Sequence, residues 1–326
     1  MTTFTSTPQF GGDIAAYIAQ QDLVANPDPT TPAAYVYTAA TAVPVVGAYS
    51  PMDFVNIPAA ATEAEMDSVM GLGSFDRLQQ NVTATKPSMG FTQKLRTSTL
   101  LQSAVRNASG QLNYYSMLTG NSSYARQVSG AKCESMDLDI SFESGAVTVA
   151  MHYQALYASV LAAADVTTAA IPVMTYNALT LPVYYGYHAA ILINADDYTD
   201  YIKRIRIGVR HEIERLPTKR KSISIAATPT IVLVSRHLKE KAQTTTVSLE
   251  LYQGIPVANV SILCRTNPTM TINLTDSCNL TRALSIALAD VAFASDKQSE
   301  GEVGSILNFA AEANARTFTI TEVAAT

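Results

Sequence analysis

Two arms of alternating residues, joined by a short turn, limit what this chain can fold into. The first arm, residues 136–143, reads MDLDISFE, and the second, residues 146–153, reads AVTVAMHY. Between them Ser144-Gly145 supplies a two-residue turn, which glycine's tolerance of positive φ permits. Successive side chains of a β-strand point to opposite faces. The pattern therefore predicts a β-hairpin with one apolar face and one acidic face.

The composition favours a globular protein made mainly of β-strands with short helices. Of 326 residues, 48% are apolar and only 15% are charged, which is not a disordered composition. The three cysteines form no CxxC pair, so buried neutral thiols are expected. The N-terminus lacks the pattern of a signal peptide, and no apolar stretch approaches 18 residues. We therefore expect no association with a membrane.

Changes in periodicity indicate how the chain is organised. A short helix is expected over 10–24, and the prolines of 26–32 end it and begin an extended arm. A capping-box pattern predicts a helix over 62–70, and Ser98 is expected to cap a helix that reaches about residue 107. Further strands are predicted at 75–95 (two strands), 187–193, 204–214, 221–235, 245–252, 257–264, 283–293 and 316–323. The expected divisions are an N-terminal part (1–60), a first β domain (61–165), a linker (166–180) and a second β domain (181–326).

Charge is distributed unevenly along the chain. Residues 203–241 contain 11 of the 22 lysines and arginines but only three acids, a net charge of +8. The remaining residues carry 11 bases and 24 acids, a net charge of −13, which together give the total of −5. A cationic block on an anionic body allows copies of a protein to attract one another. A solvated basic face is the alternative interpretation.

The sequence offers no catalytic, cofactor-binding or metal-binding constellation. The four histidines are far apart, and none forms an HExxH motif. The acids of 196–200 do not have the spacing of an EF-hand loop. There is no P-loop and no GxSxG motif. We therefore expect that the protein is not an enzyme and needs no cofactor.

The acidic stripe of 137–143 has two interpretations. It is either the ordinary solvent face of an antiparallel sheet or the wall of a channel along which a polyanion slides without binding. The basic residues of 203–221 likewise suit either a DNA-binding groove or contacts between subunits. Glu212 and Glu214 interrupt them, and mixed signs favour contacts between subunits.

The region from Tyr124 to Met151 resembles a passage in the major tail tube proteins of long-tailed, siphovirus-like bacteriophages. In that passage a tyrosine and a glycine-cysteine-lysine element precede an alternating strand, and here 131–133 reads AKC. The order of elements over roughly 35–323 is similar to the duplicated, two-domain class of the family. The Leu-Leu helix at Leu100 and the second long strand at 202–215 fall where that class has them.

The resemblance implies a fold and a function. Each half would be a tail-tube-type β-sandwich, with sheets that join those of neighbours in a closed β-barrel ring. Three two-domain copies, or six copies, would form a ring, and rings would stack helically with the N-terminal part reaching between subunits. The tube would belong to the virion, be made in the host cytoplasm, and conduct viral DNA without binding it specifically. Further partners would be the tape measure protein and the tail tip or terminator proteins.

Two sets of residues are the candidates for these roles. The candidate lumen-facing residues are Asp137, Asp139 and Glu143. The candidate inter-subunit residues are Arg204, Arg206, Arg210, Lys219, Arg220 and Lys221. Other virion components remain alternatives: a distal tail or baseplate hub ring, or a capsid or decoration protein. A carbohydrate-binding β-sandwich is a further alternative, which the absence of tryptophan disfavours.

Overall fold

In the computed structural model the chain is mainly β with few helices, as predicted. The structure describes residues 14–21, 49–52, 59–70, 77–121, 124–143, 145–155, 157–162, 182–216, 237–252, 268–276, 282–299 and 308–323. In these ranges the strands form a twelve-stranded and a five-stranded sheet, and neither sheet closes into a barrel.

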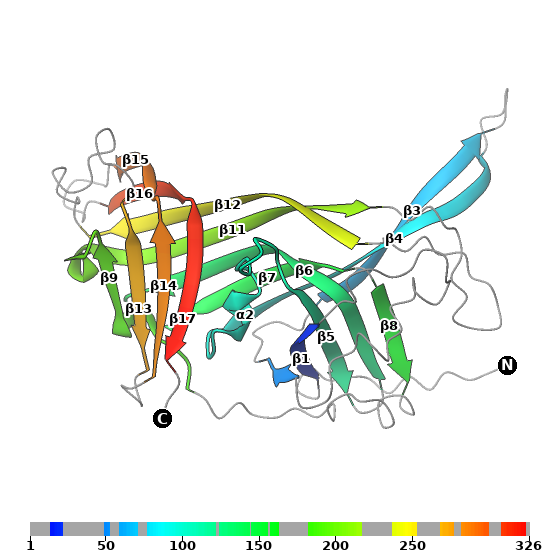
Figure 1. The fold of residues 1–326 in the computed structure, drawn as a ribbon, viewed down its shortest axis with the longest axis horizontal. Helices are drawn as coiled ribbons and strands as arrows, with labels where there is room; N and C mark the ends of the chain where they lie inside the picture. Colours follow the sequence, from blue (N-terminus) through cyan, green and yellow to red (C-terminus); the bar gives the residue numbers. More distant parts are fainter. Residues whose placement is uncertain are drawn as a thin grey trace.

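A row of antiparallel strands forms the body of the large sheet, in the order β3-β4-β7-β6-β11-β12-β16-β15 (Figure 1). Every neighbouring pair in this row is antiparallel. The strands span Ala59–Met70 (β3), Arg77–Lys94 (β4), Thr148–Gln154 (β7), Tyr124–Ser141 (β6), Ile202–Leu216 (β11), His237–Leu251 (β12), Asn308–Ala315 (β16) and Ala292–Ser299 (β15).

Strand β6 belongs to two layers. Its second half pairs with β7 and β11, whereas its first half pairs with β5 (Tyr114–Asn121) and β8 (Tyr157–Ala162). Beyond β5 lie β1 (Ala15–Gln21) and β2 (Ser50–Pro51). Gly130 lies where β6 changes layer and has φ +62°, a left-handed conformation that suits glycine. Figure 1 shows β1, β5 and β8 turned away from the long strands.

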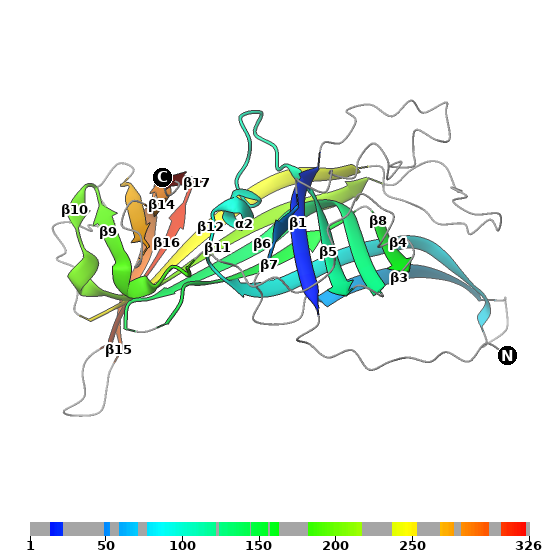
Figure 2. The same ribbon diagram turned by 90° about the horizontal axis from the view of Figure 1, so that it is seen from below.

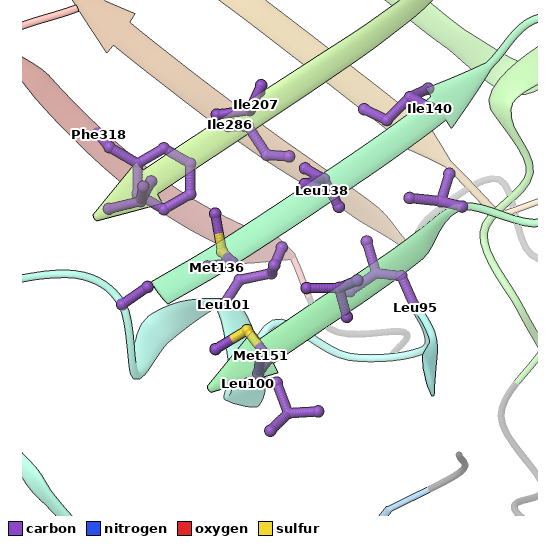
Figure 3. Close-up of a cluster of buried hydrophobic side chains, with 14 of the residues drawn as sticks. Leu95, Leu100, Leu101, Met136, Leu138, Ile140, Met151, Ile207, Ile286 and Phe318 are labelled. Atoms are coloured by element: carbon purple, nitrogen blue, oxygen red, sulfur yellow. The ribbon is translucent and has the colours of Figure 1, made fainter. Parts of the chain in front are cut away.

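The small sheet and a short helix cover the apolar face of the row. The small sheet has the order β10-β9-β13-β14-β17 and crosses the long strands (Figures 1 and 2). Its strands span Asp196–Asp197 (β10), Ala189–Ile193 (β9), Met270–Thr275 (β13), Ala283–Ala289 (β14) and Thr317–Val323 (β17), and the helix is α2 (Thr99–Gln102). Together these elements enclose one core, in which Leu138 and Ile207 face Leu101, Ile286 and Phe318 (Figure 3). Each fully buried side chain of this kind contributes about 1.5–3 kcal/mol.

The predicted hairpin is confirmed, but its turn is not. Met136 pairs with Met151 and Leu138 with Val149, and all four side chains are buried. However, β6 ends at Ser141 and β7 begins at Thr148, so the two-residue turn at Ser144-Gly145 is wrong. The backbone leaves the ladder early because Phe142 N donates to Lys203 O and Val147 N donates to Tyr184 O, both at 2.9 Å.

Two predicted helices are strands. The helix over 10–24 is wrong because residues 15–21 form β1, where five consecutive residues from Ala15 to Ala19 are all buried. An apolar run buried on both faces satisfies helical spacing by accident. The helix over 62–70 is also wrong, since β3 pairs with β4 along its whole length. Tertiary pairing overrides a local capping signal.

Other expectations are met in part or stay open. The helix after Ser98 exists but ends at Gln102, and the two strands expected over 75–95 are one strand, β4. The strands predicted at 221–235 and 257–264, and the linker 166–180, lie outside the described residues. The division into two domains stays a prediction. Because β6 pairs with β11, the two halves of the chain share the large sheet.

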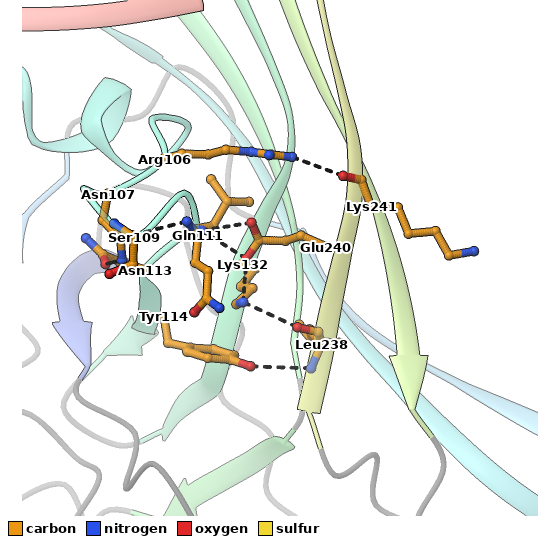
Figure 4. Close-up of polar contacts among 11 residues, drawn as sticks. Arg106, Asn107, Ser109, Gln111, Asn113, Tyr114, Lys132, Leu238, Glu240 and Lys241 are labelled. Carbon is orange, nitrogen blue, oxygen red and sulfur yellow. Dashed lines mark hydrogen bonds and ion pairs between the residues drawn. The ribbon is translucent and has the colours of Figure 1, made fainter.

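A buried ion pair also joins the two halves (Figure 4). Lys132 Nζ donates to Glu240 Oε1 at 2.5 Å, and the two side chains are 6% and 7% exposed. Lys132 lies 4.3 Å from the centroid of the Tyr114 ring and donates to Leu238 O at 3.3 Å. The Glu240 carboxylate also accepts from Leu112 N at 2.9 Å. A charged pair this deep needs all these partners to offset the loss of water.

Candidate functional site

The long strands β6, β11 and β12 present two different faces. One face is apolar and buried in the core, as the alternation predicts. The other carries charged and hydroxyl side chains that are exposed or half-buried, and we call it the polar face. Its residues are Asp137, Asp139, Arg204, Arg206, Gly208, Arg210, Thr246, Ser248 and Glu250.

A network of four charges occupies the β9-proximal half of the polar face. Arg204 Nε donates to Asp139 Oδ1 at 2.7 Å, and its Nη2 donates to Asp139 Oδ2. This paired carboxylate raises the pKa of Arg204 above its ordinary value. Arg206 lies 3.7 Å from Asp139 Oδ2 and 3.6 Å from Glu250 Oε1. Cross-strand pairing explains the arrangement, because Arg206 is directly opposite Asp139 in the ladder.

Arg210 neutralises the second acid of the stripe. Its Nη2 donates to Asp137 Oδ1 at 2.6 Å and to Oδ2 at 2.8 Å, while Nη1 donates to Met136 O and Val209 O at 3.1 Å. The polar face thus pairs three arginines with three carboxylates. Each pair is partly exposed, so its contribution to stability is about 0–1 kcal/mol. Their main effect is that the six charges of these pairs cancel.

Gly208 is one of the residues that line a depression in the polar face. The depression has a volume of about 460 Å³, and its lining also includes Asp137, Arg206, Thr246 and Asn314. A Cβ on Gly208 would lie 2.8 Å from Thr246 Oγ1 and 3.3 Å from Asp137 Oδ1. The absence of a side chain at Gly208 therefore leaves room for Thr246 Oγ1 and Asp137 Oδ1.

A second cluster continues the polar face on β7. His152 Nδ1 lies 2.8 Å from Glu134 Oε2, and Gln154 Nε2 donates to Glu134 Oε1. The hydrogen bond from His152 lowers the pKa of the Glu134 carboxyl. Glu134 also lines a depression of about 430 Å³ beside Arg210 and Thr244. Polar side chains thus extend across β7, β6, β11 and β12.

The structure brings together residues that the sequence assigned to separate surfaces. Asp137 and Asp139, expected in a lumen, pair directly with Arg204, Arg206 and Arg210, expected between subunits. Glu143 lies beyond the end of β6, 3.4 Å from Lys203 Nζ. Lys219, Arg220 and Lys221 lie outside the described residues. The lumenal and inter-subunit roles of both sets stay predictions.

Sequence reasoning missed Glu250, the third carboxylate of the polar face. A signal was present, because Thr246, Ser248 and Glu250 alternate with the buried residues Val247, Leu249 and Leu251. It also missed Lys132 and Glu240, whose pairing depends on a contact 108 residues apart.

Within the described ranges, no group of three or more histidine, cysteine or acidic side chains could hold a metal ion. Cys133 is buried, and burial raises the pKa of its thiol well above the ordinary value. No helix in the part of the chain that the structure describes is long and apolar enough to cross a membrane.

Comparison with solved structures gives distant likenesses. The sequence matches no family model and no curated protein. The fold is similar to a chain in a structure described as "Cryo-EM structure of the anti-feeding prophage (AFP) baseplate, 6-fold symmetrised". The identity is 12% and the TM-score 0.28, and the match covers 45% of this chain and 97% of the other.

Proposed function

We propose that this protein is a structural component of the virion that assembles into the tail tube of a long-tailed bacteriophage. One observation carries the proposal. The row of long strands has a charge-balanced polar face and ends on each side in a strand, β3 or β15, that pairs on one side only within the described residues. Exposed strand edges invite pairing with another chain, and closure into a barrel removes them.

The order of strands suits closure by head-to-tail pairing. The row β3-β4-β7-β6-β11-β12-β16-β15 contains an even number of strands that alternate in direction. When β15 of one copy meets β3 of the next, the two strands are therefore antiparallel, like every other pair in the row. Joining two different edges is a heterologous contact, which produces a ring if the rotation closes.

The width of duplex DNA favours three copies in a ring. Strands are about 4.8 Å apart and tilt by roughly 40° in a barrel. Three copies would give a backbone diameter of about 48 Å and, after roughly 6 Å of side chain on each wall, a bore of about 36 Å. Two copies would leave only about 20 Å, which is roughly the width of the duplex itself. Three is the smallest number that leaves clearance.

The polar face would line this bore. Proteins hold nucleic acid mainly by neutralising phosphates with unpaired lysine and arginine side chains. On the polar face, Arg204, Arg206 and Arg210 are already engaged by carboxylates of the same chain. Viral DNA would therefore pass without specific binding, while the hydroxyls of Thr246 and Ser248 keep the wall hydrated.

Electron microscopy of the purified protein tests the proposal. We expect uniform hollow cylinders with three-fold symmetric rings. Single rings that never lengthen would instead favour a hub ring of the tail or baseplate, and closed shells would favour a capsid protein. A compact monomer at high concentration would overturn the proposal.

Proline substitutions on the β3 edge test the mode of closure. Neighbouring residues of a strand point their N–H groups in opposite directions. Of the two variants Ala60→Pro and Ala61→Pro, one therefore loses an N–H that points outward, and the other loses an N–H that bonds to β4. We expect the first to keep the circular dichroism spectrum of the wild type and to form no rings, while the second, the matched control, disrupts the β3–β4 ladder. Normal rings from both variants would exclude closure through β3.

A further inference from the structure

Residues 104–112, which we call the strap, lie between α2 and β5 and are attached to the second half of the chain. Arg106 Nη2 donates to Lys241 O at 3.3 Å, and Leu112 N donates to the Glu240 carboxylate at 2.9 Å (Figure 4). Both acceptors belong to β12, whereas the strap belongs to the first half of the sequence. The strap therefore connects segments that are far apart in the sequence.

The middle of the strap is a turn that forms its own hydrogen bonds. Asn107 Oδ1 accepts from Ser109 N at 3.0 Å and from Gln111 N at 3.1 Å, and Asn107 N donates to Gln111 O at 2.8 Å. Residues 107–111 are all exposed, and Gly110 has φ +73°. Because these bonds lie within the turn, the strap can leave the sheet without breaking them.

A buried histidine forms the third attachment of the strap. His211 on β11 is 3% exposed, and its Nε2 lies 3.0 Å from Ala104 O. A carbonyl oxygen only accepts, so Nε2 carries the hydrogen of the neutral ring and Nδ1 carries none. Nδ1 is buried and has no hydrogen-bond partner among the described residues. A second proton would therefore enter the ring at an atom that no acceptor faces.

The charges around His211 also disfavour a second proton. Arg106 faces it from the strap and Glu240 from β12, and Glu240 is already paired with Lys132 of β6 at 2.5 Å. The surroundings thus contain two cations and one anion, while the charged neighbours of His211 on β11 itself are exposed on the opposite face. Burial is the largest cause that lowers the pKa of His211, and the Arg106 charge acts in the same direction. The hydrogen bond to Ala104 O and the charge of Glu240 oppose them in part.

We propose that acid releases the strap from β11 and β12, and that His211 is the trigger. In the docked state a second proton places a buried charge beside Arg106, whereas in the released state water hydrates that charge. Acid therefore favours release below pH about 6.5, the ordinary pKa of histidine. In this range the ratio of released to docked strap rises by up to about tenfold for each unit of pH, because one proton separates the two states. This inference does not depend on the proposed tube.

Release of the strap also affects the contact between the two halves of the chain. The Glu240 carboxylate loses its hydrogen bond from Leu112 N, and Leu112, which is 2% exposed when docked, meets water. The Lys132–Glu240 pair then has fewer partners to offset its burial. We therefore expect acid to loosen the joint between β6 and β12 near this pair before the sheet itself unfolds.

Hydrogen exchange of the full-length protein, followed by mass spectrometry, tests the proposal. Strap peptides are compared with β7 peptides above and below pH about 6.5, after correction for the pH dependence of exchange in unstructured peptides. Protection of the strap amides, including Leu112 N, should decrease by up to about tenfold per pH unit, while β7 keeps its protection. Strap protection that does not change with pH contradicts the proposal, and so does an equal loss of protection in the strap and in β7.

Substitutions at His211 and beside it identify the group responsible. His211→Gln keeps an N–H donor for Ala104 O but takes up no proton, so its strap should stay protected as the pH falls. Arg106→Gln removes a cation beside His211 and should weaken the pH effect. His188→Gln is the matched control: His188 is half-buried in η4 (Gly186–His188), and this variant's strap should behave as in the wild type.

Each outcome of these variants decides the role of His211. If His211→Gln folds and acid still releases its strap, His211 is not the trigger. If His211→Gln does not fold, Arg106→Gln decides: a pH effect as large as that of the wild type refutes the proposal, and a weaker one supports it. A weaker pH effect in His188→Gln would also refute it, because titration elsewhere would then release the strap.

Discussion

Replacing Lys132 with methionine should cost more stability than removing the whole Lys132–Glu240 pair. In Lys132→Met the Glu240 carboxylate, 7% exposed, loses its cation and, among its contacts with the described residues, keeps the hydrogen bond from Leu112 N. Breaking a buried pair on one side costs about 3–5 kcal/mol. In Lys132→Met/Glu240→Gln the amide oxygen still accepts from Leu112 N, and no charge is buried. We expect this double variant to lose about 2 kcal/mol or less.

Urea unfolding followed by circular dichroism and tyrosine fluorescence measures these differences. The double variant should be more stable than Lys132→Met by at least about 1 kcal/mol, the difference between the two expected losses. Lys241→Met is the matched control, because Lys241 lies one residue along β12 and its partners Glu212 and Glu214 are exposed. Its unfolding midpoint should stay at the wild-type value. If Lys132→Met and the double variant lose the same free energy of unfolding, the reasoning is refuted, because the unpaired buried carboxylate would then not destabilise the protein.

Three further perturbations test other parts of the structure. Gly186→Ala should lower the free energy of unfolding by about 3 kcal/mol, the upper part of the usual overpacking range, because the added Cβ would lie 1.9 Å from the Ser141 backbone. Thermal unfolding measures this loss. The control Gly90→Ala, whose Cβ would lie 3.4 Å from His152, should unfold at nearly the wild-type temperature. Burial lowers the pKa of His211, which also faces Arg106 and Glu240. The free energy of unfolding should therefore be highest above pH about 6.5 and should decrease as the pH falls toward the lower pKa of the folded state. Unfolding measured at a series of pH values should show a weaker pH dependence in His211→Phe and an unchanged one in His188→Gln. Asp137→Asn/Asp139→Asn/Glu250→Gln leaves three arginines unpaired, so its tubes should bind a short DNA duplex in fluorescence anisotropy, with affinity that falls as salt rises, whereas wild-type tubes should not.

The sequence predicts the elements whose pattern is local. The hairpin around Leu138 and the strand around Ile207 alternate without error, and the structure places both as expected. The strand β1 could not be predicted in this way, because a run buried on both faces has no period of two. The β3 capping signal was local and real, but pairing with β4 outweighs it. Alternation of apolar and polar residues predicts a strand that has one buried face. It does not predict a strand in which both faces, or neither face, are buried.

The candidate site shows the same limit. The acids of the stripe and the arginines of β11 were both identified from the sequence, but the pairing of Asp139 with Arg204 and Arg206 depends on β6 lying beside β11. The 65 residues between Asp139 and Arg204 hide this neighbour relation. Composition gives the number of charges, and only register determines which of them cancel.

This cancellation of charge changes the interpretation of the basic segment 203–241. Of its 11 bases, Lys203, Arg204, Arg206, Arg210 and Lys241 pair with carboxylates, and Arg215 donates to Ala155 O and Pro87 O. The four bases of 217–236 have no acid in their own segment. Pairing of Arg204, Arg206 and Arg210 with carboxylates leaves these arginines without free charge for phosphates, which is the property that the proposed DNA-conducting tube requires.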